Sequence, residues 1–367
     1  MVWEDGGSNP ASYPIKSARH ATNTAMNAPT RTSPRPLEGA SAWVITDGKA
    51  GMLVQARGVA DALGLDYVEK EVHPRGLFAV IAPWGPVAPS ERLGEAGSNF
   101  APPWPDVVIA TGRASIPYVR AIRKKSGPRT YTIVLQDPKS GANTADLIWV
   151  PEHDKRRGAN VITTPTAPHS FSQERLAELR AAPAAEIAAL PGPRVTVVLG
   201  GKNGVYKFTD ADDDRLQTSL TSLAALGASF MITSSRRTHQ RLIAAAEAAT
   251  RDAPRIVWTG GGENPYPGFL ACADALIVTA DSVNMCGEAC ATGKPVYIFS
   301  PSGGSAKFTR FHEALAETGA VRALPDRFSS LESWDYQPLD AAKSIAAEIE
   351  RRYARRSHML SGLSRPG

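Results

Sequence analysis

The sequence has little cysteine and no long apolar run. Its 367 residues include only three cysteines, too few for a disulfide framework and not at the spacing of a zinc site, so a reducing compartment is expected. These thiols are interpreted as small core residues, with a reactive thiol as the alternative: Cys272, Cys286 and Cys290. No stretch of about 18 apolar residues is present, so the sequence predicts no transmembrane helix.

The excess of positive charge is confined to the C-terminus. The net charge of +5 is carried by five arginines in residues 351–367, a stretch without acids: Arg351, Arg352, Arg355, Arg356 and Arg365. Removing these five from the 41 basic residues leaves 36, which equals the number of acidic residues. A broad basic face for nucleic acid is therefore not predicted. The arginines either complement a helix dipole or contact anionic lipid, which fits a cytoplasmic protein peripheral to the inner membrane.

The order of the apolar segments predicts two domains. Residues 1–40 are rich in Pro, Ser, Thr, Ala and Asn and lack periodicity, which predicts a disordered tail. Strand and helix patterns then alternate, pause at the "LPGPR" of residues 190–194, and restart. Continuous apolar strands of this kind form parallel sheets covered on both faces. The sequence thus predicts an α/β fold of two doubly wound Rossmann-like domains facing across a cleft, at 41–190 and 191–338, then a C-terminal helix and basic tail at 339–367.

The most specific stretch is "VTADSVNMCGEACATGKPVYIF", residues 278–299. It reads as a buried strand, a polar turn, a helix and a second strand, and the free N–H groups at such a helix start suit a phosphate. Glu288 lies about 9 Å further along the helix, on the face shared by Asn284 and Met285, where a carboxylate can accept ribose hydroxyls. The alternative is that Asp281 and Ser282 only cap the helix and Glu288 is paired locally.

Other polar turns follow strands along both halves of the chain. In open α/β sheets, ligands bind at the carboxyl ends of the strands, so these turns are expected to line one crevice. In the second half, candidate anion ligands are Gly200, Gly201, Lys202, Ser234, Ser235 and Arg236, with Lys307 and Arg310 after a later glycine turn. In the first half, the corresponding residues are Asp47, Gly48, Lys49, Gly51, Gly112, Arg113, Gln136, Asp137 and His153. Each turn is also compatible with plain capping or a solvated loop, and the acids of residues 210–214 suit a helix start better than a divalent ion.

These motifs resemble a known family. "ITDGKAG", "QDP", "LGGKNG", "TSSRRT", "ADSVNMCGEA", "GKPVYIF" and "KFTRFH" occur in order over residues 42–323 and resemble the mitochondrial fission ELM-type family. The segment 259–310 is also similar to the C-terminal donor site of GT-B glycosyltransferases. That similarity implies a nucleotide-sugar substrate, no cofactor, and a helix start that replaces a metal in stabilising the departing diphosphate.

The resemblance also implies roles for the individual turns. Glu288 would hold the ribose, and Asp47 or His153 would serve as base. An acceptor would be bound by the turn from Asp47 to Gly51 together with Gly112, Arg113, Gln136 and Asp137. The competing interpretation, suggested by plant relatives, is a non-catalytic scaffold at a membrane surface that keeps the fold. The motifs name neither the acceptor nor an oligomeric state.

Overall fold

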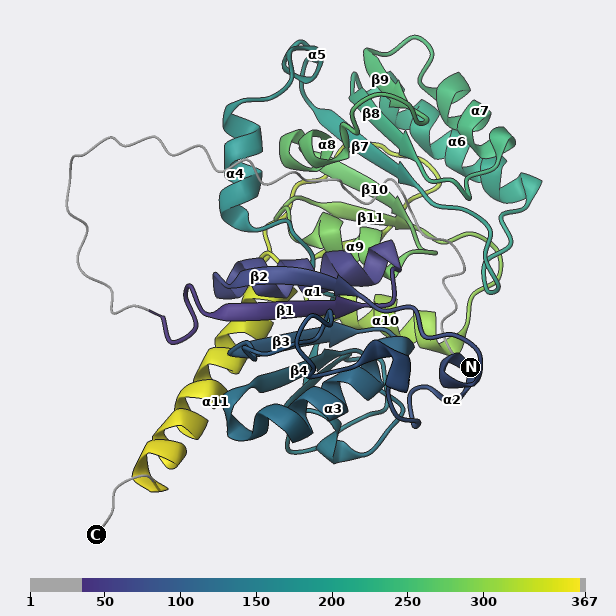
Figure 1. Cartoon of the computed structure of the whole chain (residues 1–367). Helices are drawn as coiled ribbons and strands as arrows, with labels where there is room; N and C mark the ends of the chain where they lie inside the picture. Colours follow the sequence, from purple (N-terminus) through teal and green to yellow (C-terminus); the bar gives the residue numbers. More distant parts are fainter. Residues whose placement is uncertain (1–34, 364–367) are drawn as a thin grey trace, which may run out of the picture.

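Two six-stranded parallel sheets form the framework of the computed structural model, which describes residues 35–363 (Figure 1). The first sheet has the order β2-β1-β3-β4-β5-β6. Its strands are β1 (Ser41–Thr46), β2 (Asp66–Glu71), β3 (Val107–Thr111), β4 (Tyr131–Leu135), β5 (Leu147–Pro151) and β6 (Val161–Thr164). The main helices of this half are α1 (Ala50–Leu63), α2 (Leu77–Ile81) and α3 (Ile116–Ser126). Helices α1 and α3 pack against strands of this sheet.

The second sheet has the order β12-β11-β10-β7-β8-β9. Its strands are β7 (Arg194–Leu199), β8 (Ser229–Ser234), β9 (Arg255–Trp258), β10 (Ala275–Thr279), β11 (Val296–Phe299) and β12 (Val321–Ala323). The helices are α4 (Gln173–Ala181), α5 (Ala185–Ala188), α6 (Asp210–Ala225), α7 (Gln240–Ala249), α8 (Tyr266–Cys272), α9 (Val283–Cys290), α10 (Ala306–Glu317) and α11 (Ala341–Leu363). The predicted class, two doubly wound α/β units, is confirmed by both strand orders.

Each sheet has a buried apolar core. The central strands β3, β4 and β10 are buried along their whole length, as continuous Val, Ile, Leu and Ala runs predict. Separate apolar clusters cover the two faces of the first sheet, and one large cluster surrounds the second. The three cysteines are buried and unbridged, and burial raises the pKa of each thiol, which fits their interpretation as core residues.

The connections differ from the sequence pattern in three places. The alanine-rich spacing of residues 172–190 alone predicts one helix, but the structure has two, α4 and α5, because Pro183 cannot donate a backbone hydrogen bond within a helix. Helix α11 continues the chain back onto the first half, where it packs on α1 and β6. Figure 1 shows this helix running along the first half. Most of the segment expected to be disordered, 1–40, lies outside the described residues, but Leu37 is fully buried in the first core.

Candidate functional site

Both sheets reverse their strand order at the places where the sequence puts its polar turns. In the second sheet the reversal falls between β7 and β10, and in the first between β1 and β3. Ligands of open α/β sheets bind at such switch points, beyond the carboxyl ends of the strands. The turns at 200–204 and 280–282 flank one switch point, and those at 47–49 and 112–115 flank the other.

A buried aspartate organises the switch point of the second sheet. The side chain of Asp281 is fully buried, and its Oδ1 accepts a hydrogen bond from Thr279 Oγ1 at 2.6 Å. Its Oδ2 accepts from the N–H of Gly201 at 3.1 Å and pairs with Arg237 at 3.3 Å. Burial raises the pKa of this carboxyl, while those donors oppose the rise. Asp281 therefore ties the two turns together from inside.

The glycines of the 200–204 turn make this arrangement possible. A Cβ on Gly200 would lie 2.0 Å from Asp281 Oδ1, and one on Gly201 would lie 2.0 Å from the carbonyl oxygen of Arg237. Asn203 closes the turn by accepting hydrogen bonds from the N–H groups of Val205 and Tyr206. Both glycines thus serve close packing within the protein, a constraint that is separate from ligand approach.

The starting turns of α9 and α1 meet at the junction of the two halves. Ser282 caps α9 by accepting from Met285 N, and within the described residues the N–H groups of Val283 and Asn284 have no hydrogen-bond partner. Helix α1 begins without a side-chain cap, and neither helix has an acid in its first turn. A Cβ on Gly51, near the start of α1, would lie 3.4 Å from Asn284 Nδ2. Two positive helix ends therefore converge without a compensating charge in those turns.

A row of amides crosses this junction. Gln136 Nε2, which follows β4, donates to Gln55 Oε1 at 3.0 Å, and Gln55 Nε2 donates to Asn284 Oδ1 at 3.3 Å. Gln55 is buried on α1, whereas Ser282, Val283, Asn284 and Met285 are half-buried. The helix start of the second half is thus in contact with the first half and remains accessible to solvent.

Glu288 lies inside the second half, on the same helix. It is buried, and its Oε2 accepts a hydrogen bond from the Tyr266 hydroxyl at 2.7 Å. Burial raises the pKa of Glu288 to about 7, and the Tyr266 hydrogen bond opposes the rise. A buried carboxyl with a single neutral donor can accept further hydroxyl groups, and their hydrogen bonds would favour its charged form.

Asp47 is the least satisfied carboxylate at the junction edge of the first sheet. Its side chain is 11% exposed, its Oδ2 lies 3.8 Å from Lys49 Nζ, and its buried Oδ1 has no hydrogen-bond partner in the described part of the chain. Gly112, with φ of +89°, lies directly against it, because a Cβ there would be 2.4 Å from Asp47 Cγ. Gly48 packs in the same way against Glu71. Asp47 thus has one carboxylate oxygen without a partner in the described chain.

His153 lies where the first half contacts α10. Its ring packs edge-on against Phe311 at 5.4 Å between centroids, and the neighbouring Asp154 pairs with Lys307 Nζ at 2.5 Å. Burial and then Lys307 lower the pKa of His153 to about 4, with Arg310 adding to the effect, so the imidazole is neutral at pH 7. Further along α10, His312 Nε2 lies 2.9 Å from the carbonyl oxygen of Ala280. Lys307 and Arg310 therefore place positive charge beside His153, and Asp154 offsets that of Lys307.

Several predicted ligands have other partners. Arg113 donates to the carbonyl oxygens of Val80 and Ala82, and Asp137 pairs with Lys139 and Arg156, which lower its pKa against the effect of burial. The backbone N–H of Ser235 donates to the hydroxyl of Thr238, and that hydroxyl donates to the carbonyl oxygens of residues 199 and 200. Plain capping of α7 by Thr238, the simpler alternative for this turn, is therefore wrong. Lys202 and Arg236 are exposed, and Ser234 is half-buried.

Two charged segments of the chain, residues 210–214 and the C-terminal arginines, include side chains with partners within the protein. Asp212 forms a capping box with Thr209 at the start of α6, so this acid of the 210–214 run stabilises a helix end. Among the C-terminal arginines, Arg356 ties α11 to the first half by binding Asp146, whereas Arg351 and Arg352 bind Glu348 of the same helix and lower its pKa to about 2. Arg365 lies outside the described residues. No helix among the residues described has both the length and the apolar character needed to cross a membrane.

Sequence reasoning missed the partners that fix this site. Gln55, Thr279, Arg237, Asn203 and Tyr266 were not predicted, although each contacts a predicted residue or turn. A signal existed for Gln55, which is the one polar residue in the apolar face Val54–Val59–Ala60 of α1 and is itself buried. No sequence signal pairs Tyr266 with Glu288, because 22 residues and a strand separate them.

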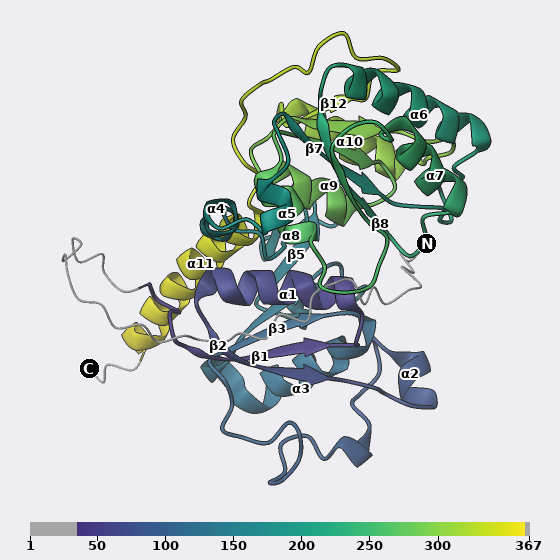
Figure 2. The same ribbon diagram turned by 90° about the horizontal axis from the view of Figure 1, so that it is seen from above.

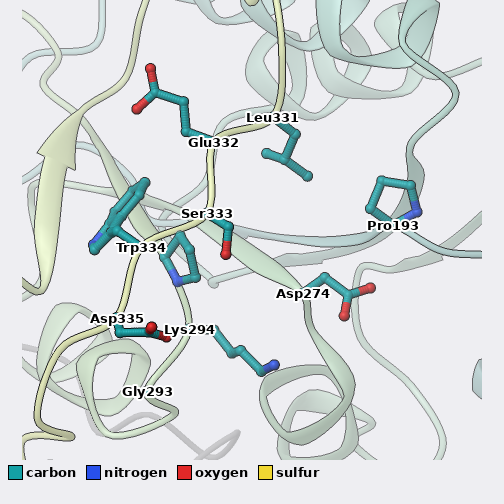
Figure 3. A pocket seen from close by; sticks show the side chains of 10 residues that line it. Pro193, Asp274, Gly293, Lys294, Leu331, Glu332, Ser333, Trp334 and Asp335 are labelled. Carbon is teal, nitrogen blue, oxygen red and sulfur yellow. The ribbon is translucent and has the colours of Figure 1, made fainter.

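A distinct hollow lies at the opposite edge of the second sheet. Its volume is about 320 Å³, and Pro193, Asp274 and Pro295 mark it as the edge where β7, β10 and β11 begin. Figure 3 shows Leu331 towards the top of this hollow, Lys294 towards the bottom and Asp274 to the right. None of the predicted site residues lines it.

Comparison with known proteins identifies the family. A family model described as mitochondrial fission ELM1 matches residues 50–353. The mitochondrial fission protein ELM1 of Arabidopsis thaliana is 31% identical over 280 residues, 70% of this chain and 66% of that protein. The uncharacterized protein RP120 of Rickettsia prowazekii is 34% identical over 160 residues, 42% of this chain and 45% of that protein. The chain thus spans just under two thirds of the first relative and under half of the second.

Solved structures give a weaker likeness. The UDP-GlcNAc 2-epimerase of Methanocaldococcus jannaschii has a TM-score of 0.49 and 9% identity, covering 85% of this chain and 99% of that one. MurG of Acinetobacter baumannii has a TM-score of 0.43 and 16% identity, covering 86% and 91%. At these scores the likeness supports no functional conclusion. The family model covers most of the sequence, and the chain belongs to the mitochondrial fission ELM1 family.

Proposed function

We propose that the chain binds a nucleotide sugar where α1 and α9 meet and transfers the sugar without a metal, as a glycosyltransferase of the GT-B type. The observation that carries this proposal is the convergence of two helix starts with unpartnered N–H groups and no first-turn acid. Such ends attract a diphosphate through hydrogen bonds and through the helix dipoles. Lys307 and Arg310 add positive charge from α10.

The donor would occupy the second half. Its diphosphate takes the N–H groups of Val283 and Asn284, and the Asn284 side chain leaves Gln55 to bind an oxygen of the ligand. Glu288, which lies further along α9, accepts hydrogen bonds from the ribose hydroxyls. Asp281 does not touch the ligand in this arrangement, since its side chain is fully buried and both of its oxygens accept hydrogen bonds from Thr279, Gly201 and Arg237. It fixes the two turns that frame the site.

In the transfer step, the acceptor hydroxyl oxygen bonds to the anomeric carbon of the sugar while the bond from that carbon to the diphosphate breaks. The nucleoside diphosphate leaves with the electron pair, and the two helix ends stabilise its negative charge in place of a metal ion. The hydroxyl proton goes to Asp47, whose Oδ1 is unpartnered. His153 is the weaker base, because burial and neighbouring cations disfavour its charged form.

A ligand panel tests the proposal. Wild-type protein in the presence of EDTA is heated with UDP, GDP, ADP and CDP sugars in turn. One nucleotide class should raise the melting temperature by a few degrees at a concentration about a hundred times its dissociation constant. Glu288→Gln should remove the response, whereas Glu178→Gln, an exposed glutamate on α4, should retain it. Absence of a shift with every class rejects nucleotide-sugar binding and leaves the scaffold interpretation.

A further inference from the structure

An apolar face is exposed on the short helix α2. Leu77, Val80 and Trp84 have 67%, 69% and 63% of their surfaces exposed, and they are three of the six large apolar side chains that are exposed in the described residues. Leu77 and Val80 lie three positions apart on one face of the helix. Figure 2 places α2 at the margin of the first half, with free space beyond it. Clustered exposure of this kind marks an interaction surface more often than scattered single residues do.

Firm backbone contacts hold this face outward. Arg113 donates to the carbonyl oxygens of Val80 and Ala82, and Arg120 donates to that of Trp84 at 2.8 Å. The Trp84 indole N–H donates to the carbonyl oxygen of Lys139 at 2.9 Å. Because these hydrogen bonds fix the backbone of the segment, its apolar side chains remain exposed to solvent.

The charge around this face is positive. Arg113 and Arg120 have no carboxylate partner in the described chain, and the Arg113 guanidinium lies 5.9 Å from the Trp84 ring centre. Lys139 and Arg156 share the single carboxylate of Asp137. Arg75 lines a neighbouring hollow of about 400 Å³ together with Glu71 and Glu91, which offset it. The positive charge therefore arises mainly from Arg113 and Arg120, which donate hydrogen bonds to the backbone of this segment.

We propose that Leu77, Val80 and Trp84 dock this face of the protein on an anionic lipid bilayer. Apolar side chains that project from a support containing unpaired arginines fit the boundary between lipid headgroups and acyl chains, where tryptophan is favourable. This surface is distinct from the arginine-rich C-terminus, in which Arg351, Arg352 and Arg356 are occupied within the protein. Arg113 follows β3 directly, so docking brings the edge of the sheet that carries Asp47 towards the bilayer.

Vesicle co-sedimentation of the full chain tests this inference. The wild type should bind vesicles of phosphatidylcholine with phosphatidylglycerol, and bind phosphatidylcholine alone much more weakly. The triple variant Leu77→Ser/Val80→Ser/Trp84→Ser should bind the anionic vesicles at least about tenfold less. Leu226→Ser, which removes an exposed apolar residue elsewhere, should bind like the wild type. Since none of the three residues is buried, circular dichroism should show all variants folded.

Arg120→Gln and added salt test the charge component, and each should weaken binding. Three results would overturn the inference: a wild type that binds neither vesicle, a triple variant that binds as well as the wild type, or equal binding to both lipid compositions. A fourth would reassign the surface to a protein partner: concentration-dependent dimers in sedimentation velocity that the triple variant abolishes while vesicle binding is unchanged. Nucleotide binding at α9 is not needed for any of these outcomes.

Discussion

The turns after β1 and β10 have the same architecture and opposite electrostatic states. Each follows a buried strand, contains an aspartate packed against a glycine, and leads into a helix whose start reaches the junction. Asp281 accepts three hydrogen bonds and is wholly buried. Asp47 has one oxygen without a partner and a lysine at 3.8 Å. The comparison teaches that an aspartate in a turn after a parallel strand can be either fully hydrogen-bonded or left with an unsatisfied oxygen.

The difference assigns separate tasks to the two halves. The second half has the rigid site, because Asp281 fixes two turns and Glu288 has its hydroxyl donor in place. The first half carries a buried carboxylate oxygen, Asp47 Oδ1, that has no hydrogen-bond partner among the described residues. An unsatisfied buried carboxylate oxygen has a free-energy cost, which is common at functional sites and uncommon elsewhere.

The largest effect is expected from truncating the two aspartates. Asp281→Ala leaves the N–H of Gly201 and the hydroxyl of Thr279 without their acceptor, and should lower the free energy of unfolding by about 4 kcal/mol. Asp47→Ala removes an unsatisfied oxygen and should change it by less than about 1 kcal/mol while abolishing sugar transfer. Urea unfolding and turnover assays measure both. Equal losses of stability in the two variants would contradict the expected difference between the two aspartates.

Glu288 provides a pH test of the rigid half. Burial raises its pKa from 4.5 to about 7, so the folded state retains a proton that the unfolded state has lost in this window. The contribution of Glu288 to the free energy of unfolding is therefore fully present below pH 4.5. It falls as the pH rises and is lower by about 3 kcal/mol above pH 7. Glu288→Gln should not show this fall. Unfolding midpoints between pH 4 and 8 measure the difference, and parallel profiles for the two proteins would contradict it.

The two glycines offer a matched pair of smaller changes. Gly200→Ala places a methyl group against a carboxylate fixed by three donors and should cost about 3 kcal/mol. Gly112→Ala meets a carboxylate that can move, so its cost, about 2 kcal/mol, comes mainly from the positive φ. The double variants Gly200→Ala/Asp281→Ala and Gly112→Ala/Asp47→Ala separate the steric cost of the methyl group from the cost of the backbone conformation. Asp281→Ala should relieve more of the cost at position 200 than Asp47→Ala relieves at position 112, and the reverse order would show that Asp47 is the more rigid of the two.

The smallest effect concerns the contact that joins the halves. Gln55→Ala removes the hydrogen bond to Asn284 and should change the free energy of unfolding by about 1 kcal/mol or less. Because that amide must leave Asn284 when a diphosphate binds, the variant should bind the nucleotide somewhat more tightly than the wild type. Calorimetric titration with the nucleotide found in the panel measures this, and weaker binding would show that Gln55 supports the ligand instead.

The sequence was sufficient for the strands and for the turns that carry polar groups. Alternation of apolar runs and helical spacing predicts two parallel sheets, and it also predicts which polar residues follow the strands. The break at Pro183 could have been read from the sequence as well, since proline disfavours a helix interior. The short β12 was not predicted, because three residues with two exposed side chains leave almost no periodic signal.

What the sequence by itself determined is which residues stand at the carboxyl ends of the strands, because period and burial are local properties of the chain. What only the tertiary structure decided is which of those polar atoms acquire partners. The donors to Asp281 come partly from a turn 80 residues away, and the amide that meets Asn284 comes from 229 residues away. Hydrogen bonding depends on atoms that folding brings within about 3 Å, so the satisfied and the free aspartate look alike in the sequence and differ only in the fold.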